Sequence, residues 1–302
     1  MKKISEPIIF FGSGPVAAKT LEFLESHFAI HGVITKPVPP HHHEKAPVIE
    51  VAERNSLDIY YVRDKNDLIE LFRSQKISNN IRLGILVDFG VIIPSLVLHH
   101  FKLGIINSHF SLLPEWRGAD PITFAILSGQ LVTGVSLMLI VEGMDEGPVL
   151  AQKPYNLSPD TTTPQLTEDL IKLSNSMLAS TLPPYISGKI HPVEQNKNNP
   201  VSYSRRLTKD DGRVDWHKDA TQLEREIRAF AGWPRSHATI NDTQVIITKA
   251  HTIDLPGEAG KVDSIDGKLV IHCGKQSLII DWLKPVSKNE MSGSDFLRGH
   301  PI

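Results

Sequence analysis

The sequence predicts an α/β domain followed by a smaller β-rich domain, and three observations support this organisation. Between residues 8 and 90, short β-rich apolar runs alternate with segments of helical spacing, which is typical of repeated βαβ units and a parallel sheet covered on both faces. Beyond residue 204, short apolar runs are separated by turn residues, as in a small β-barrel or sandwich. A length of 302 residues also favours two domains.

The first domain is expected to alternate strands and helices along most of its length. Strands are predicted at IIFFG, AIHGVITK, DIYYV, LGILVDFG, IINSHF, GVSLMLIVE and VLAQKPYNL. Helices are predicted at residues 15–24, at VIEVAERN, at DLIELFRSQ, at residues 94–101, at ADPITFAILSG and from about residue 163 to 187.

A polar segment, HPVEQNKNNPVSYSRR, contains Asn and Pro but no apolar period, and it is interpreted as a linker between the domains. Beyond it we expect a helix at QLEREIRAFAG and strands at ATI, QVIITKAHTI, AGKVDSI, KLVIHC and SLIIDWL. The predicted boundaries are therefore 1–189 for the first domain, 190–203 for the linker and 204–302 for the second domain.

The composition indicates a globular protein, with 40% hydrophobic and 22% charged residues. The N-terminal MKKISEP leads directly into an apolar strand, so no signal peptide is expected, and no apolar run approaches the ~20 residues of a membrane helix. Cys273 is the single cysteine, which excludes an intramolecular disulfide and fits a cytoplasmic location. A net charge of -2 gives no general attraction to nucleic acid.

Three polar residues stand out in the stretch from Gly104 to Gly147. Asn107 and His109 are two apart in the predicted strand IINSH, so they point to the same face. Asp145 lies in the glycine-flanked turn GMDEG, which follows another apolar strand. The amide and a protonated imidazole can donate hydrogen bonds to an oxyanion, and a nearby carboxylate favours imidazolium.

A plain structural interpretation also exists, with a loop-capping asparagine, an interior histidine and an ordinary turn aspartate. A serine or cysteine nucleophile is not expected at this site. Ser108 points away from His109 on the strand, and Cys273 lies in the other domain.

The glycine loop Gly12-Ser13-Gly14 follows the first strand and precedes a helix, as in a dinucleotide fingerprint. The second strand ends in GVITKP, however, and offers no acidic residue for a ribose hydroxyl. The alternative is a tight βα turn that presents amides to an anionic substrate group.

The histidine run at residues 41–43 invites a metal-site interpretation. Consecutive side chains diverge in direction, and the chain supplies a single thiol, so we expect a solvated loop and no metal.

Beyond these residues, INSHFSLLPEWRGADPI and GVSLMLIVEGMDEGPVL resemble the core of the folate-dependent formyltransferases. FFGSGPVAAKTL, GVIIPSLVL, YSRRLTKDDGRVDW and RAFAGWP resemble the branch of that family that formylates methionyl-tRNA. The resemblance covers nearly the whole chain. It implies a Rossmann-like N-terminal formyltransferase domain and a C-terminal OB-like β-barrel domain that binds tRNA.

The resemblance also implies an activity, namely transfer of the formyl group of 10-formyltetrahydrofolate to the amino group of initiator methionyl-tRNA. It assigns catalysis to Asn107, His109 and Asp145. The donor is expected at the strand exits, against Gly90, Val91, Ile92, Val141, Glu142 and Gly143. The substrate-binding residues are expected to be Gly12, Ser13, Gly14, Arg117, Arg205 and Arg206.

The chain departs from the family pattern in several places. After the second strand it has only KPVPPHHHEKAPV, where the tRNA enzymes usually carry a longer basic insertion. Phe110 and Asp120 also stand where the family more usually has smaller neutral residues, and Asp88 interrupts the end of an apolar strand. Two alternatives remain open, a sugar-nucleotide N-formyltransferase that uses the same donor and a catalytically silent RNA-binding relative. A dehydrogenase is a distant further alternative.

Overall fold

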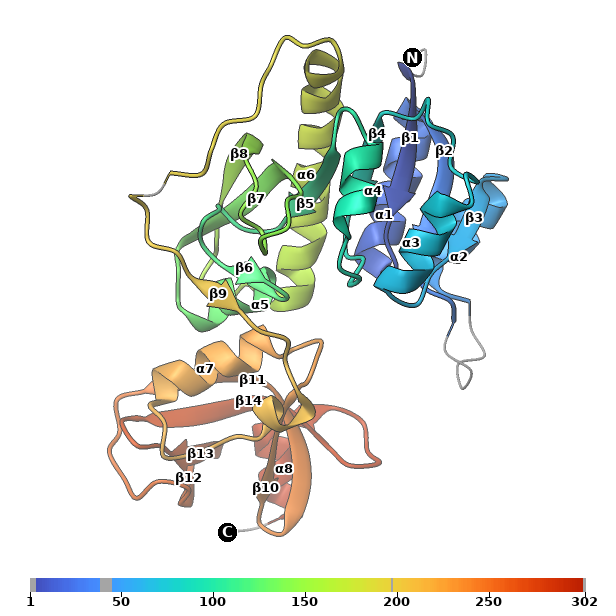
Figure 1. Ribbon diagram of the computed structural model, residues 1–302. Coiled ribbons are helices and arrows are strands. Elements are labelled where there is room, and N and C mark those ends of the chain that lie inside the picture. The colour runs from blue at the N-terminus through green and yellow to red at the C-terminus, as the bar shows by residue number, and fades with distance from the viewer. Residues whose placement is uncertain (1–3, 39–44, 197, 301–302) are drawn as a thin grey trace. The chain divides into compact units, whose positions relative to one another are not determined.

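The computed structural model describes residues 4–38, 45–196 and 198–300, which form two compact units (Figure 1). The first unit contains the chain up to Gly118 together with Val132–Asn156 and Thr167–Tyr203. The second unit contains Ala119–Leu131, Leu157–Leu166 and the chain from Ser204 onward. The second unit therefore also includes two short segments that precede residue 190 and interrupt the first unit in the sequence.

The first unit is built on a seven-stranded sheet in the order β3-β2-β1-β4-β5-β7-β8. Its strands are β1 (Ile4–Phe11), β2 (Phe28–Thr35), β3 (Asp58–Tyr61), β4 (Leu83–Leu86), β5 (Ile105–His109), β7 (Val132–Leu139) and β8 (Val149–Asn156). The pairs among the first five strands are parallel, whereas β7 and β8 are added antiparallel. The predicted α/β fold is confirmed. The carboxyl ends of β4 and β5 meet at one edge of the sheet.

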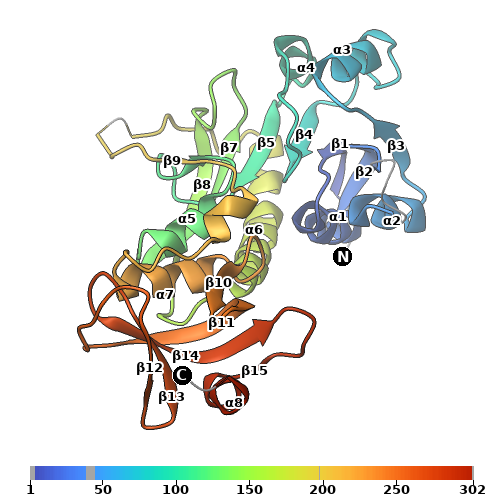
Figure 2. The same cartoon turned by 90° about the horizontal axis from the view of Figure 1, so that it is seen from below.

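The helices of the first unit are α1 (Pro15–His27), α2 (Pro47–Arg54), α3 (Lys65–Arg73), α4 (Ser95–His100) and most of α6 (Thr163–Ile186). Figure 2 shows α1 and α2 on one face of the β1–β4 part of the sheet and α3 and α4 on the other. Pro15 begins α1, where its missing N–H would have had no partner. The central strands are buried on both faces, which explains their unbroken apolar runs.

Two strands end earlier than their apolar runs suggest. The run LGILVDFG forms a strand only to Leu86, because Asp88 and Gly90 adopt left-handed backbone angles, with φ of 46° and 66°. Strand β7 likewise ends before its apolar run does, at Leu139. These early ends expose loop backbone at the edge of the sheet.

The second unit contains a six-stranded antiparallel sheet. Its strands are β10 (Ser236–Ile240), β11 (Thr243–Ile253), β14 (Ser277–Pro285), β13 (Lys268–His272), β12 (Val262–Ile265) and β15 (Met291–Ser292). Its helices are α5 (Pro121–Leu127), the short η1 (Lys209–Gly212), α7 (Ala220–Ala229) and α8 (Gly293–Gly299). Separately, β6 (Arg117–Gly118) and β9 (Tyr203–Ser204) pair with each other in a small two-stranded sheet. The predicted small antiparallel β domain is confirmed.

The hairpin turns of the second unit follow from their residues. Asn241 and Asp242 connect β10 to β11 with positive φ angles of 44° and 58°, as a type I′ turn requires. Asp266 and Gly267 connect β12 to β13 in the same way. The elements β15 and α8 were not predicted, because MSGSDFLRG is too short for a clear period. In the described part of the chain, no helix combines the length and apolarity needed to cross a membrane.

Candidate active site

Strand β5 carries the first two candidate residues at its carboxyl end. Asn107 pairs with Met138 of β7 and His109 with Ser136, and both side chains are almost fully buried, with 9% and 5% exposure. Ser108 points to the opposite face, where its hydroxyl lies 2.6 Å from the hydroxyl of Ser174 on α6. The predicted alternation of the strand is confirmed, and Ser108 is not available as a nucleophile beside His109.

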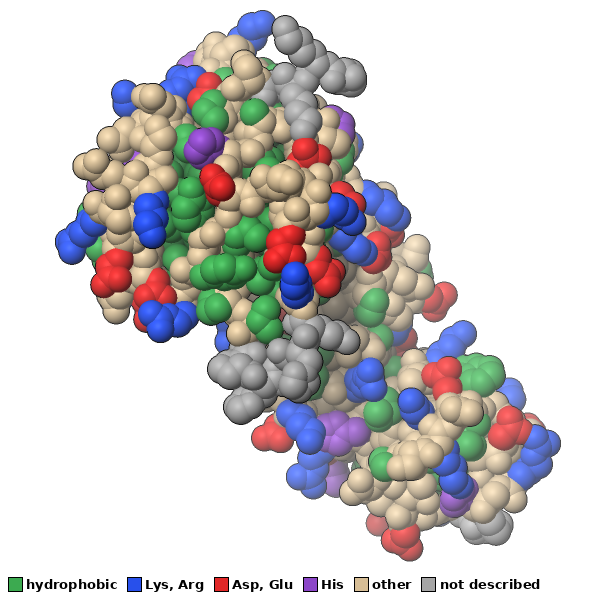
Figure 3. Space-filling view, turned by 90° about the vertical axis from the view of Figure 1, so that its right-hand side faces the viewer, with side chains coloured by type: hydrophobic (Ala, Val, Ile, Leu, Met, Phe, Trp, Pro, Cys, Tyr) green, Lys and Arg blue, Asp and Glu red, His purple; other side chains and the backbone are tan. Residues whose placement is uncertain are grey.

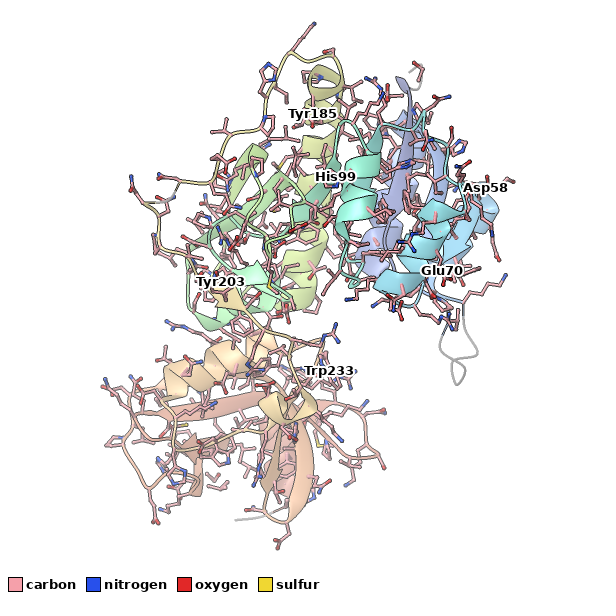
Figure 4. The ribbon with its side chains drawn as sticks, viewed as in Figure 1. Asp58, Glu70, His99, Tyr185, Tyr203 and Trp233 are labelled. Atoms are coloured by element: carbon pink, nitrogen blue, oxygen red, sulfur yellow. The ribbon has the colours of Figure 1, made fainter. Side chains whose placement is uncertain are left out.

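The start of β5 is anchored by α6. The Tyr185 hydroxyl donates a hydrogen bond of 2.6 Å to the carbonyl oxygen of Leu103, just before the strand begins (Figure 4). A buried tyrosine normally needs such a partner for its hydroxyl. This contact ties the last turns of the long helix to the strand that presents the site.

Asp145 lies in the turn after β7, and its carboxylate faces both β5 residues. One carboxylate oxygen, Oδ1, lies 3.5 Å from Nδ2 of Asn107, and the other, Oδ2, lies 3.7 Å from Nδ1 of His109. The Gly118 N–H donates a hydrogen bond of 2.8 Å to Oδ2. The structure thus brings the three predicted catalytic residues together in one place.

The other ring nitrogen of His109 has a fixed partner. Its Nε2 lies 2.8 Å from the carbonyl oxygen of Trp116, and a carbonyl can only accept, so Nε2 carries a proton. The nitrogen that faces the site is therefore Nδ1. Its distance of 3.7 Å from the carboxylate is too long for a hydrogen bond.

The loop between β5 and β6 is held by polar contacts with β7 and β8. The Ser136 hydroxyl accepts from the Leu113 N–H at 3.0 Å and donates to the Ser111 carbonyl at 2.6 Å. Gln152 of β8 donates to the Leu113 carbonyl at 2.8 Å. These bonds fix the path of the loop that ends in Trp116, and hence the carbonyl that orients His109.

The glycine loop after β1 is packed against the exit of β4. The Gly12 N–H donates to the Ile34 carbonyl at 3.1 Å, and the Ser13 N–H donates to the Asp88 carbonyl at 3.0 Å. A Cβ atom on Gly14 would come within 1.9 Å of an Asp88 carboxyl oxygen. Two of the loop amides are therefore engaged within the protein, and a neighbouring carboxyl disfavours an anionic group. The segment forms a tight βα turn, and the role of Gly12, Ser13 and Gly14 in substrate binding stays a prediction.

Asp88 is exposed overall, but its carboxyl group packs against the glycine loop at Gly14. Burial of that carboxyl raises the pKa of Asp88 above its ordinary value, and the positive charge of Lys36 partly opposes the shift. The Lys36 ammonium itself donates a hydrogen bond of 2.9 Å to the carbonyl of Gly90. A charged carboxylate at this position is thus partly desolvated.

The two segments predicted to hold the folate donor lie at neighbouring strand exits. Gly90, Val91 and Ile92 follow β4, and the exposed fraction of Ile92 is 78%. Val141, Glu142 and Gly143 follow β7, and the Ser95 hydroxyl at the start of α4 donates a hydrogen bond to the Glu142 carboxylate.

These exits combine exposed backbone with apolar side chains that remain open to solvent, namely those of Ile92, Leu96, Val141 and Met144. A flat heterocycle with polar edges requires both features, an apolar wall and nearby backbone donors and acceptors. The residues present therefore fit a pteridine ring. Their role in donor binding stays a prediction.

The arginines predicted to bind substrate lie in different environments. Arg117, in the first unit, donates to the Glu146 carboxylate at 2.9 Å and has a mostly buried side chain. Arg205 lies in the second unit, where its guanidinium pairs with Asp211 and holds the pKa of that carboxyl well below its usual value. Arg206 is exposed in the same unit. The roles of all three in substrate binding remain predictions.

Metal ligation finds no support among the residues that the structure describes, because none of their His, Cys, Asp and Glu side chains gather in groups of three or more. The histidine run at residues 41–43 lies outside the described residues.

One residue of the site was missed by the sequence analysis. Gln195 lies in the predicted linker, yet it is 9% exposed and contacts both Arg117 and the turn that carries Asp145. Its polar surroundings in the sequence have no apolar period, so no local pattern could have indicated a buried contact.

Comparisons with known proteins agree with this fold. Residues 8–182 match the Formyl transferase family, and residues 206–301 match the Formyl transferase C-terminal domain. The methionyl-tRNA formyltransferase of Methylococcus capsulatus is 33% identical over 302 residues, which cover 98% of this chain and 97% of that protein. The Myxococcus xanthus protein of the same name is 39% identical over 220 residues, or 72% of this chain and 70% of that protein.

Among solved structures, the N-formyltransferase of Helicobacter canadensis in complex with folinic acid and dTDP-3-aminofucose is similar in fold. Its TM-score is 0.67 at 18% identity, and the match covers 92% of this chain and 99% of that one. With both parts of the chain matched and full-length relatives above 30% identity, the chain belongs to the formyl transferase family and is a formyl-transferring enzyme.

Proposed function

We propose that the chain transfers the formyl group of 10-formyltetrahydrofolate to the amino group of initiator methionyl-tRNA. The observation that carries this proposal is the meeting of Asn107, His109 and Asp145 at the end of β5. It is supported by relatives named methionyl-tRNA formyltransferase, which match the C-terminal unit as well as the N-terminal one. Such substrates imply a cytoplasmic location.

The proposed chemistry begins with attack of the neutral amine on the formyl carbon. Negative charge then develops on the formyl oxygen, and Nδ2 of Asn107 and a protonated Nδ1 of His109 donate hydrogen bonds to it. Because Nε2 is held by the Trp116 carbonyl, Nδ1 is the ring nitrogen available for this task. At 3.7 Å from Nδ1, the Asp145 carboxylate does not take up the Nδ1 proton in a hydrogen bond and leaves it available for the oxyanion.

The bond between the formyl carbon and N10 of the folate then breaks, and tetrahydrofolate leaves as N10 gains a proton. The attacking amine must lose a proton in the same reaction. The Asp145 carboxylate, held by the Gly118 N–H and partly open to solvent, is the nearest base and can take this proton through water.

Binding of the tRNA would rely on local contacts. The net charge is -2, and acidic and basic side chains are interspersed on the face drawn in Figure 3. Phosphate contacts would therefore come from individual exposed residues such as Arg206. Replacing such a residue should weaken binding uniformly and reduce the dependence of affinity on salt concentration.

The test is a direct comparison of acceptors. Purified protein, 10-formyltetrahydrofolate labelled in the formyl group, and either initiator methionyl-tRNA or an amino-sugar nucleotide are incubated in parallel. We expect label on the methionyl amino group and none on the sugar. Label on the sugar alone would support an N-formyltransferase of the sugar-nucleotide type, and label on neither would contradict the proposed acceptor.

A further inference from the structure

We propose that Gln195 is a positioning residue for formyl transfer, because its single side-chain amide holds both the turn that carries Asp145 and the side chain of Arg117. The inference rests on the function proposed above and assigns a task in that reaction to the segment predicted as a linker.

The amide of Gln195 has a partner for each of its hydrogen-bonding groups. Its Nε2 donates to the carbonyl oxygens of Asp145, at 2.7 Å, and Gly147, at 2.9 Å. Its Oε1 accepts from Nη2 of Arg117 at 2.8 Å. The opposite orientation of the amide would set an oxygen against two carbonyls and an NH2 group against a guanidinium, so the contacts fix the assignment.

The turn needs such support because its backbone is constrained. Asp145 has a φ of 51°, in the left-handed region that non-glycine residues rarely adopt. At Gly147 the chain passes so close to β7 that a Cβ would lie 1.8 Å from the Leu139 carbonyl oxygen. Gln195 binds the main chain at both positions, on either side of Glu146.

The same amide reaches the other segment that contacts Asp145. Arg117 precedes Gly118, whose N–H donates to the Asp145 carboxylate, and the Arg117 guanidinium also pairs with Glu146 in the turn. Gln195 thus fixes the main chain of Asp145. It also helps to fix Arg117, the neighbour of Gly118, whose N–H binds the Asp145 carboxylate. The carboxylate is held at 3.5 Å from Asn107 and 3.7 Å from His109 by contacts on both sides.

The segment that delivers Gln195 is itself attached to the sheet. Val193 and Val149 at the start of β8 exchange two backbone hydrogen bonds, of 2.7 and 2.8 Å. Gln195 follows two residues later. The amide is therefore presented from backbone that is fixed to the sheet.

The decisive variant is Gln195→Glu, which keeps the size and the acceptor for Arg117 but replaces the donor to the two carbonyls. Gln195→Ala removes all three contacts, and Asn196→Ala is the matched control because Asn196 is exposed and its side chain bonds only within its own segment. Single-turnover transfer to methionyl-tRNA, KM for donor and acceptor, and the melting temperature are measured for each full-length protein.

We expect both Gln195 variants to lose about 10- to 100-fold in the single-turnover rate, because small displacements of a reacting group have effects of this size. Both KM values should stay close to those of the wild type, the melting temperature should fall because buried partners of the amide are left unpaired, and Asn196→Ala should match the wild type throughout. A wild-type rate in Gln195→Glu, or a loss confined to KM or to thermal stability, would overturn the positioning role.

A second measurement does not depend on activity. In NMR spectra of the wild type, the Gln195 side-chain NH2 signals, identified by their loss in Gln195→Glu, should exchange with water far more slowly than those of Asn196. Fast exchange would refute the proposed contacts of the Gln195 amide even if formyl transfer is observed. Slow exchange in a protein that fails to formylate methionyl-tRNA would instead refute the proposed function, while the hydrogen bonds of the Gln195 amide would be confirmed.

Discussion

The turn after β1 and the turn after β7 look alike in the sequence, since both place glycines around polar residues at the end of an apolar strand. In the structure they differ. In the first turn the N–H groups of Gly12 and Ser13 are used by neighbouring carbonyls, and the closest carboxyl group, of Asp88, faces Gly14. In the second, the Asp145 carboxylate faces Asn107 and His109. A glycine-flanked turn becomes a candidate site only when side chains from another strand converge on it.

The strongest test of this contrast removes the groups that converge on the second turn. Asn107→Ala and His109→Ala should each cost about 3 to 4 kcal/mol of transition-state stabilisation, a loss of two to three orders of magnitude in kcat. Single-turnover transfer to methionyl-tRNA measures the loss, and thermal melting checks the fold. His31→Ala, at an exposed position, is the control. An undiminished rate in both variants would remove the proposed oxyanion donors.

The second test examines the charge state of the same site. Because the amine must be neutral and His109 charged, kcat/KM should follow a bell-shaped dependence on pH, falling up to tenfold per pH unit at each side. Asp145→Asn should also reduce activity, since the site then loses the group proposed to accept the amine proton. A flat profile with chemistry rate-limiting is incompatible with these roles.

A substitution in the first turn, after β1, should change the stability of the protein and not its rate of formyl transfer. A Cβ on Gly12 would lie 2.6 Å from Ala17 and 2.9 Å from the Val87 carbonyl oxygen. Gly12→Ala should therefore lower the free energy of unfolding by about 1 to 3 kcal/mol, as overpacking does. Denaturant unfolding measures this change, and the rate per folded molecule should remain near that of the wild type. A large rate loss in fully folded Gly12→Ala would restore a substrate-binding role to the loop.

The smallest expected effect concerns Asp88. Its pKa is raised in the folded state by burial, so the ionised carboxylate destabilises the fold, and the cost is present at neutral pH. As pH falls through the folded-state pKa towards the ordinary aspartate value of 3.8, the carboxyl becomes protonated and the cost disappears. Asp88→Asn should thus raise the free energy of unfolding at pH 7 by less than about 1 kcal/mol, since solvent screens an exposed residue.

The comparison for Asp88 is made by denaturant unfolding of both proteins across the acid range. The advantage of the variant over the wild type should shrink as the pH falls through the raised pKa of Asp88 towards 3.8. A constant difference at all pH values would mean that desolvation of the charge is not its cause.

Much of the fold followed from periodicity. The long apolar runs predicted most strands and helices because a strand buried on both faces, or an amphipathic helix, leaves a direct trace in the sequence. The end of β4 was missed because φ angles at Asp88 and Gly90, and not hydrophobicity, stop the strand. The short elements β15 and α8 had too few residues to show a period.

The site was predictable in part for the same reason. Asn107 and His109 share a strand, so alternation alone places them on one face. Their meeting with Asp145 across a different strand pair required the structure. The contacts of Gln195 could not be predicted, because they depend on where an irregular segment passes over the sheet, which its own residues do not encode.

The hydrogen bond between His109 Nε2 and the Trp116 carbonyl also determines how a tight inhibitor should behave. With Nε2 always protonated, a neutral ring presents a lone pair at Nδ1, which would repel an oxyanion. A stable analogue that carries a negative oxygen at the formyl position can then bind only together with one proton. Calorimetry of such an analogue at alkaline pH, in buffers of different ionisation enthalpy, should record the uptake of that proton.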